Sequence, residues 1–172
     1  MNLADSDFAL FALPERFRQD RAALDARWKE LQREAHPDRH AAQGAAAQRV
    51  AMQWSVRINE AYQRLKDPLK RAAYLCEQRG APINAESNTA MPTAFLMQQM
   101  QWREALDEAA TEDELDALAR ELSAARARVL AHIERLLDEA QDAAAAANEV
   151  RALMFIERFD HDVQARFEQL GQ

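Results

Sequence analysis

The amino-acid sequence predicts an all-α fold from two features. Glycine and proline interrupt helices, and the 172 residues include only three glycines and five prolines. Hydrophobic residues make up 48 % of the chain, enough for a buried core, and along most of it they recur every three or four positions, as in amphipathic helices. We therefore expect helices throughout, in one domain or in two small ones.

Composition also limits where the protein works. Cys76 is the single cysteine, which excludes an internal disulfide and a cysteine-based zinc site and fits a reducing, cytoplasmic location. The sequence has no run of about eighteen apolar residues, so no membrane-spanning segment is predicted. Asp5 and Asp7 are acidic where a targeting peptide would be basic, so we expect neither a secretory nor a mitochondrial signal.

Charge is distributed unevenly along the chain. Residues 1–76 contain 13 Lys and Arg against 10 Asp and Glu, a net charge of +3. Residues 77–172 contain 9 against 19, a net charge of −10. This contrast indicates two modules with different partners, and the absence of a dominant basic stripe argues against nucleic acid as one of them.

A short helix and a long helix are expected before residue 36. Asp5 or Ser6 can cap the short helix, which Pro14 ends, and Asp20 is a suitable N-cap for the long one. The long helix carries one apolar face, formed by Leu24, Trp28, Leu31 and Ala35.

His36-Pro37-Asp38 follows this helix and is its predicted stop. Proline lacks a backbone N–H and pushes the preceding residue out of helical geometry, so the helix must end near Ala35. His36 and Asp38 are then exposed on a stiff loop at the tip of two helices. The loop is either a contact surface for a partner or a helix stop and nothing more.

A second long helix is expected after Gly44, and Asp67-Pro68 ends it. The two long helices should pack antiparallel, and a short helix through Leu69 and Leu75 can close over them. The apolar face of the second helix consists of Val50, Trp54, Ile58, Ala61, Tyr62 and Leu65.

The segment Gly80–Pro92 is rich in residues that break helices, and we place the domain boundary there. The predicted units are residues 1–76, a linker at 77–91, and a three-helix domain at 92–172.

The first helix of the C-terminal domain runs from about Thr93 to Ala109, and Thr111 begins the second helix with a capping box. The second carries a coiled-coil-like stripe of Leu115, Leu118, Leu122, Ala125, Val129, His132 and Leu136. The third carries a stripe of Ala152, Ile156, Phe159, Val163, Phe167 and Leu170.

The first 76 residues resemble a J-domain. The resemblance rests on His36-Pro37-Asp38 between antiparallel helices and on Ile58-Asn59-Glu60-Ala61-Tyr62, followed by Leu65, Asp67-Pro68, Arg71 and Tyr74. Nearly the whole chain is similar to the HscB family, the J-domain co-chaperones of iron–sulfur cluster assembly. The motifs beyond the J-domain are Phe8-x-Leu10-Phe11-x-Leu13-Pro14, Thr93-Ala94-Phe95-Leu96-Met97, Arg103-Glu104-x-Leu106-Asp107-Glu108 and Val150-Arg151-x-Leu153-x-Phe155.

The resemblance implies that the first domain docks on an ATPase chaperone of the DnaK or HscA type and stimulates it, so that this chain is not itself an enzyme. The residues acting on the chaperone would be His36, Pro37 and Asp38. Arg27, Lys29 and Arg33 are either a basic docking face or an ordinary solvated face.

The resemblance also implies that the C-terminal domain binds the cluster scaffold IscU and delivers it to the chaperone. The matching positions are Leu96, Met97, Met100, Gln101, Glu104, Glu108 and Phe155. Gln101 departs from the family pattern, which has an acidic residue there. The cysteine pairs of some eukaryotic relatives are absent, so we expect no zinc or other cofactor, and no membrane partner.

The helix from Thr93 can be interpreted without the family. At about 100° per residue, Phe95, Trp102, Leu106 and Ala109 form a core face. The opposite face carries Met97, Met100, Glu104 and Glu108, with Leu96 and Gln101 at its edges. Exposed methionines edged by carboxylates suit a protein-binding surface, unless another helix covers them. Phe155 lies at the edge of its helix's apolar stripe, so we expect it to be partly exposed.

Two alternatives to this specific co-chaperone function remain open. The first is a general J-domain adaptor for other protein clients. The second is an enzyme that uses His36 and Asp38 as an acid–base pair. His132 and His161 are interpreted as ordinary histidines at the edge of the core and on the surface.

Overall fold

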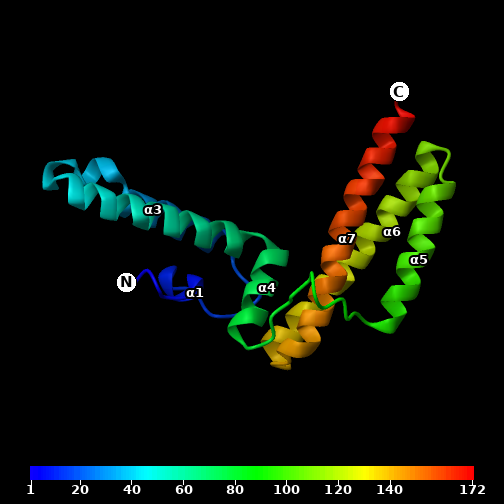
Figure 1. The fold of residues 1–172 in the computed structure, drawn as a ribbon, viewed down its shortest axis with the longest axis horizontal. Coiled ribbons are helices and arrows are strands. Elements are labelled where there is room, and N and C mark those ends of the chain that lie inside the picture. Colours follow the sequence, from blue (N-terminus) through cyan, green and yellow to red (C-terminus); the bar gives the residue numbers. More distant parts are fainter. The chain divides into compact units, whose positions relative to one another are not determined.

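The computed structural model describes residues 1–172 and contains helices and connecting segments but no strands, which confirms the predicted all-α fold (Figure 1). The chain forms two compact units, Met1–Tyr74 and Leu75–Gln172. No helix is both long enough and apolar enough to span a bilayer.

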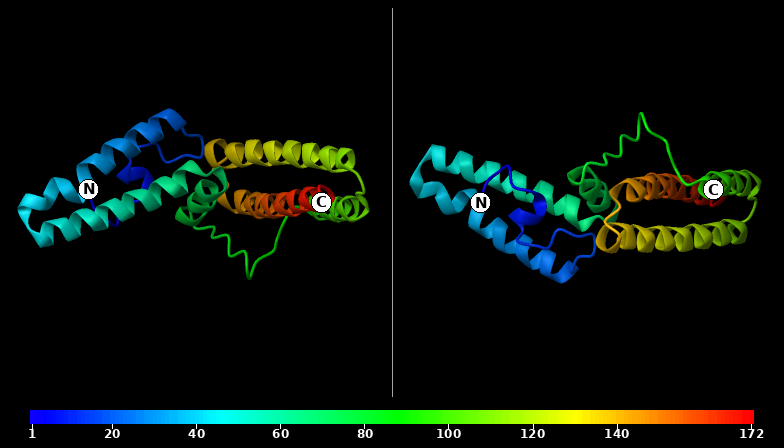
Figure 2. Two further views of the ribbon diagram at one scale, coloured as in Figure 1. Left: turned by 90° about the horizontal axis from the view of Figure 1, so that it is seen from above. Right: turned by 90° about the horizontal axis from the view of Figure 1, so that it is seen from below.

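The first unit is built on an antiparallel helical hairpin. Helices α2 (Arg21–Ala35) and α3 (Ala45–Lys66) lie side by side (Figure 2) and bury Leu24 and Leu31 against Ile58 and Leu65. The short α1 (Asp7–Leu10) precedes them, and α4 (Pro68–Gln78) follows. The bounds of α2 and α3 agree with the starts and stops predicted from Asp20, Pro37, Gly44 and Pro68. Helix α1 ends at Leu10, before the predicted stop at Pro14.

Side chains cap these helices as expected. The Ser6 hydroxyl accepts a hydrogen bond from Ala9 N–H, and the Asp20 carboxylate accepts from Ala22 and Ala23 N–H. Across the hairpin, the Tyr62 hydroxyl donates to Asp25 at 2.8 Å, and this bond, together with one from Arg21, lowers the pKa of that carboxyl.

A buried carboxylate attaches α1 to the hairpin. Asp7 is fully buried and forms ion pairs with Arg57 at 2.8 Å and Arg64 at 2.6 Å. Its backbone N–H donates to the Tyr74 hydroxyl at 2.9 Å, and burial raises the pKa of Tyr74. A buried charge is tolerated only when it is paired in this way.

Two expectations for the hairpin were wrong. Residues Pro37–Gln43 form a 3₁₀ helix, η1, where we expected a stiff loop, because Pro37 occupies its first position and His36 caps it. Val50 belongs to the predicted apolar face of α3, which should pack on α2, but it is 52 % exposed. It lies in the part of α3 beside η1, where Ala35 has already ended α2.

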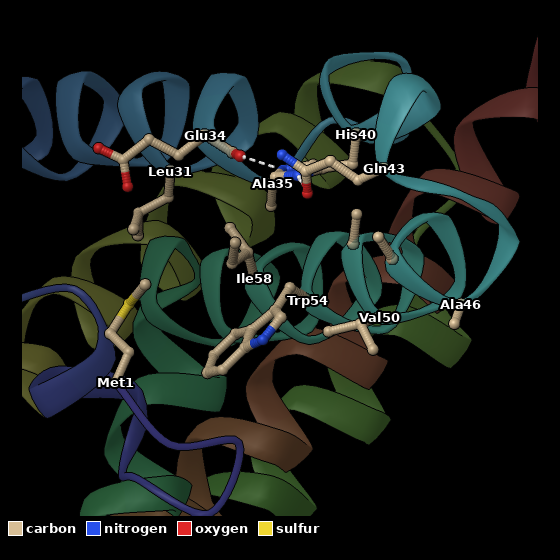
Figure 3. A pocket seen from close by; sticks show the side chains of 12 residues that line it. Met1, Leu31, Glu34, Ala35, His40, Gln43, Ala46, Val50, Trp54 and Ile58 are labelled. Atoms are coloured by element: carbon tan, nitrogen blue, oxygen red, sulfur yellow. Dashed lines mark hydrogen bonds between the residues drawn. The ribbon is translucent and has the colours of Figure 1, made fainter.

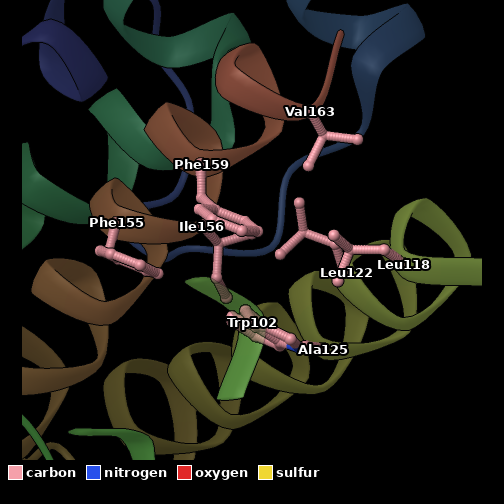
Figure 4. Packing of buried hydrophobic residues seen from close by; sticks show 8 residues of the cluster. All are labelled: Trp102, Leu118, Leu122, Ala125, Phe155, Ile156, Phe159 and Val163. Carbon is pink, nitrogen blue, oxygen red and sulfur yellow. The ribbon is translucent and has the colours of Figure 1, made fainter. Parts of the chain in front are cut away.

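The second unit contains a three-helix bundle, as predicted. It comprises α5 (Thr93–Glu108), α6 (Glu112–Glu134) and α7 (Ala143–Leu170), and a π-helical turn, η2 (Arg135–Glu139), extends α6. Thr111 caps α6 by accepting from Glu114 N–H at 3.2 Å. The core cluster of buried residues drawn in Figure 4 consists of Trp102, Leu118, Leu122, Ala125, Phe155, Ile156, Phe159 and Val163.

The predicted stripe of α6 is correct only in its N-terminal part. Beyond Val129 the fully buried residues are Ile133 and Leu137, not His132 and Leu136. A heptad assumes 3.5 residues per turn, whereas a straight helix has about 3.6, so its buried face drifts from the heptad positions. His132 instead faces Glu149 of α7, with Nδ1 and Oε1 3.3 Å apart.

The segment between α4 and α5 has no helix but is attached to the bundle. Arg151 of α7 is only 5 % exposed. Its guanidinium donates to the carbonyls of Ile83 at 3.0 Å and Ala90 at 3.3 Å, and to Asn148 Oδ1 at 2.7 Å. A buried side chain of α7 therefore fixes the path of the chain into α5.

Two candidate protein-binding surfaces

His36 and Asp38 form an exposed corner where α2 ends, which we call the 36–38 corner. The extended backbone of His36 (φ −61°, ψ 128°) ends α2 and begins η1. Its Nδ1 accepts a hydrogen bond from Asp38 N–H at 3.2 Å. In this arrangement Nδ1 carries no proton, so a neutral ring presents its N–H at Nε2.

The Asp38 carboxylate is available to a partner. Its side chain is 92 % exposed, and the only basic side chain within 4 Å of its oxygens is that of His36, whose Nδ1 lies 3.7 Å away. That distance is too long for a hydrogen bond, so the two side chains do not form an oriented acid–base pair. An exposed carboxylate on a helix-capped corner can instead accept a charge-assisted bond from a partner's cation.

The basic residues predicted to help docking are only partly gathered at this corner. Arg33 lines the same hollow as His36, Asp38 and Arg39. Arg27 does not line it, and its guanidinium pairs with Glu30 at 3.1 Å on the surface of α2. Lys29 is exposed outside the hollow as well.

An apolar cavity of about 600 Å³ lies beside the corner and was not predicted (Figure 3). Leu31 and Ala35 of α2 line one side of it, Val50, Trp54 and Ile58 of α3 line the other, and Met1 lines it as well. The sequence signal was the unequal length of the helices, 15 residues in α2 against 22 in α3. The longer helix necessarily extends past its partner and leaves apolar side chains incompletely covered.

The second candidate site is the outer face of α5, which we call the methionine surface. It consists of Leu96, Met97, Met100, Gln101, Glu104 and Glu108. The exposed fractions are 45 % for Leu96, 64 % for Met97 and 72 % for Met100. The expected exposure of both methionines is therefore confirmed, and no other helix of the chain covers them.

This surface is the place where the second unit exposes large apolar side chains. Its three large hydrophobic residues that are substantially exposed all lie between positions 96 and 100. The opposite face of α5 carries Trp102, which is 2 % exposed. The exposed Glu104 and Glu108 add negative charge, so the surface fits a partner segment with apolar and basic side chains.

Phe155 does not have the partial exposure that we expected. It is 6 % exposed and belongs to the core cluster (Figure 4). Its ring meets Phe95 edge-on at 5.8 Å and stacks on Phe159 at 5.7 Å. The Arg103 guanidinium lies over the same ring, 5.4 Å from its centre. Phe155 lies at the edge of the apolar stripe of α7, so its ring points toward α5, and residues of α5 cover it.

Comparison with known proteins places the chain in a family. Residues 91–164 match the family model described as HSCB C-terminal oligomerisation domain. The chain is 53 % identical over 173 residues to the co-chaperone protein HscB homolog of Burkholderia multivorans, covering 99 % of this chain and 98 % of that protein. It is also 53 % identical over 166 residues to the HscB homolog of Bordetella petrii, covering 94 % and 96 %.

Solved structures show the same similarity. Chaperone HscB from Vibrio cholerae aligns with a TM-score of 0.82 at 34 % identity, covering 96 % of this chain and 99 % of that one. Human HscB aligns with a TM-score of 0.88 at 23 % identity over 96 % and 84 %, which supports the fold. From its sequence relatives over nearly its full length and from its fold, the chain belongs to the HscB family of co-chaperones.

Proposed function

We propose that this co-chaperone stimulates the ATPase of an HscA- or DnaK-type chaperone through the 36–38 corner, and delivers to it an IscU-type scaffold bound on the methionine surface. The protein then acts in the cytoplasm and catalyses no reaction itself. The observation that carries the proposal is the gathering of exposed Leu96, Met97 and Met100 on one helix edged by carboxylates. A folded domain rarely leaves such side chains uncovered without a partner.

The 36–38 corner supplies the other half of the proposal. Asp38 has no arginine partner within the chain, so a chaperone arginine would meet an unoccupied acceptor. Pro37 limits the conformational freedom lost on docking. Arg33 beside the corner would favour approach to an acidic chaperone surface.

An ATPase assay with Asp38→Asn tests this proposal. Replacing the carboxylate removes a charge-assisted bond of about 1.5–3 kcal/mol, so we expect at least a ~10-fold higher concentration for half-maximal stimulation. Scaffold affinity should not change, because Asp38 lies in the other unit. Asp116→Asn, at an exposed position of α6, is the matched control. Full stimulation by Asp38→Asn would contradict the proposed role.

A second occupant of the methionine surface is another copy of this chain. The family model is described as an oligomerisation domain, and an exposed apolar helix face can serve that purpose. Analytical ultracentrifugation over a range of protein concentrations distinguishes a scaffold-binding surface from a self-association surface. Self-association that Met100→Ala abolishes would favour this second function, and a monomer that binds the scaffold would favour the first.

A general adaptor role makes a different prediction about clients. Such a protein would bind a denatured client at least as well as the folded scaffold. Isothermal titration of both ligands therefore distinguishes the proposed function from the adaptor.

A further inference from the structure

Arg103 is held in an unusual way for an exposed arginine. Its guanidinium lies over the Phe155 ring at 5.4 Å, and it forms no ion pair or hydrogen bond, although Glu104 and Asp107 are close in sequence. A cation over an aromatic face at an exposed site is a weak interaction. Arg103 is therefore held loosely, and mainly by one aromatic ring.

Helical periodicity places this contact at the rim of the methionine surface. Leu96, Met100, Arg103 and Asp107 follow one another at spacings of four, three and four residues, so they share one edge of α5. Because Arg103 contacts Phe155, this is the edge that faces the Phe155 ring. Phe155 thus lies on the side of α5 that Arg103 shares with Leu96 and Met100, although the ring contributes almost no exposed area.

The other neighbours of the ring belong to the core. Phe95, Trp102 and Phe159 surround it with centroid distances of 5.8, 6.5 and 5.7 Å, and all three are buried or half-buried. Arg103 is the exposed member of the set. Its side chain is the part of the packing that can leave without disturbing the bundle.

We propose that Arg103 is a removable cover over Phe155. When a scaffold docks on the methionine surface, the guanidinium leaves the ring and turns toward Asp107, one helical turn further on. The uncovered ring then joins Leu96 and Met100 as a third apolar contact. This inference rests on the proposed function, because it concerns the same surface and the same partner.

The proposal predicts a gain of affinity when the cover is removed. Arg103→Ala should bind the scaffold about two- to five-fold more tightly, the factor that corresponds to an exposed cation–π contact. The gain should vanish in a Phe155→Leu background, because no ring then remains to be uncovered. Arg103→Lys keeps a cation over the ring and should bind like the unmodified protein. Arg120→Ala removes the same charge from an exposed position of α6 and is the matched control.

A measurement without the scaffold tests the cover directly. With 4-fluorophenylalanine at position 155, the fluorine resonance shifts between H₂O and D₂O in proportion to solvent access. Arg103→Ala should enlarge this shift, whereas Arg103→Lys and Arg120→Ala should not. An unchanged shift in Arg103→Ala would show that Arg103 covers nothing.

The comparison of Arg103→Ala with and without Phe155→Leu can also contradict the proposal. If Arg103→Ala weakens scaffold binding by the same factor with Phe155 and with Phe155→Leu, Arg103 contacts the scaffold itself and the cover is disproved. Absence of scaffold binding to the unmodified protein would instead overturn the proposed function, while the fluorine measurement would still report on the cover.

Discussion

At the scale of single residues, Met97 and Met100 show how an exposed side chain can carry more information about function than a buried one. A buried methionine fills space, whereas an exposed one has a flexible, polarisable side chain that adapts to a partner. Both lie with Leu96 on α5, where the other residues of the methionine surface, Gln101, Glu104 and Glu108, are polar or acidic. Their contribution to binding should therefore be separable from folding.

Met100→Ala should weaken scaffold binding by about tenfold, since most of an apolar side chain is lost from the contact. Thermal stability should change little, because Met100 is 72 % exposed. Met52→Ala is a closely matched control, since Met52 is 59 % exposed on α3 of the other unit. Equal losses of affinity in the two variants, measured by titration calorimetry, would argue against a specific methionine surface.

At the scale of secondary-structure elements, Arg151 connects a helix to a segment that has no regular structure. Two of its three hydrogen bonds hold Ile83 and Ala90 against α7, in a segment where the sequence predicts only chain-breaking residues. A buried guanidinium satisfied mainly by backbone carbonyls cannot be identified from sequence spacing, because its partners are 61 and 68 residues away.

Arg151→Met should keep the bundle folded but release this segment. Amide hydrogens of residues 83–90 should exchange at least about tenfold faster, because hydrogen bonds that hold the segment are lost. Exchange measured by mass spectrometry, with Arg158→Met at an exposed position of α7 as the control, checks this expectation. Unchanged protection of residues 83–90 would mean that other contacts hold the segment.

At the scale of the whole molecule, the two proposed surfaces lie on separate compact units, so one can be inactivated while the other still binds. Excess Asp38→Asn should therefore sequester a limiting scaffold and inhibit scaffold-dependent stimulation by the unmodified protein. Adding Met100→Ala to the same chain should relieve the inhibition, which a steady-state ATPase assay can measure. Inhibition that persists in the double variant would indicate competition for the chaperone instead.

Local signals were sufficient to predict most of the fold. Asp20, Thr111 and Pro37 mark helix ends through interactions with near neighbours, and the structure agrees with each of them. The errors arose where distant elements decide the outcome. Val50 is exposed because α2 ends before covering it, and Phe155 is buried because α5 packs over it. The apolar periodicity of α3 cannot predict where α2 ends, and that of α7 cannot predict how α5 packs on it.

The buried Asp7 has a consequence for the order in which the first unit is completed. Its partners Arg57 and Arg64 lie on α3. The Tyr74 hydroxyl, which accepts a hydrogen bond from the Asp7 backbone N–H, lies 67 residues after Asp7 in the sequence. During synthesis the N-terminal residues emerge first, yet this carboxylate has no partner until α3 has left the ribosome. A nascent chain ending before residue 57 therefore lacks both cations that allow α1 to dock, and the hairpin can recruit α1 only after most of the unit has been made.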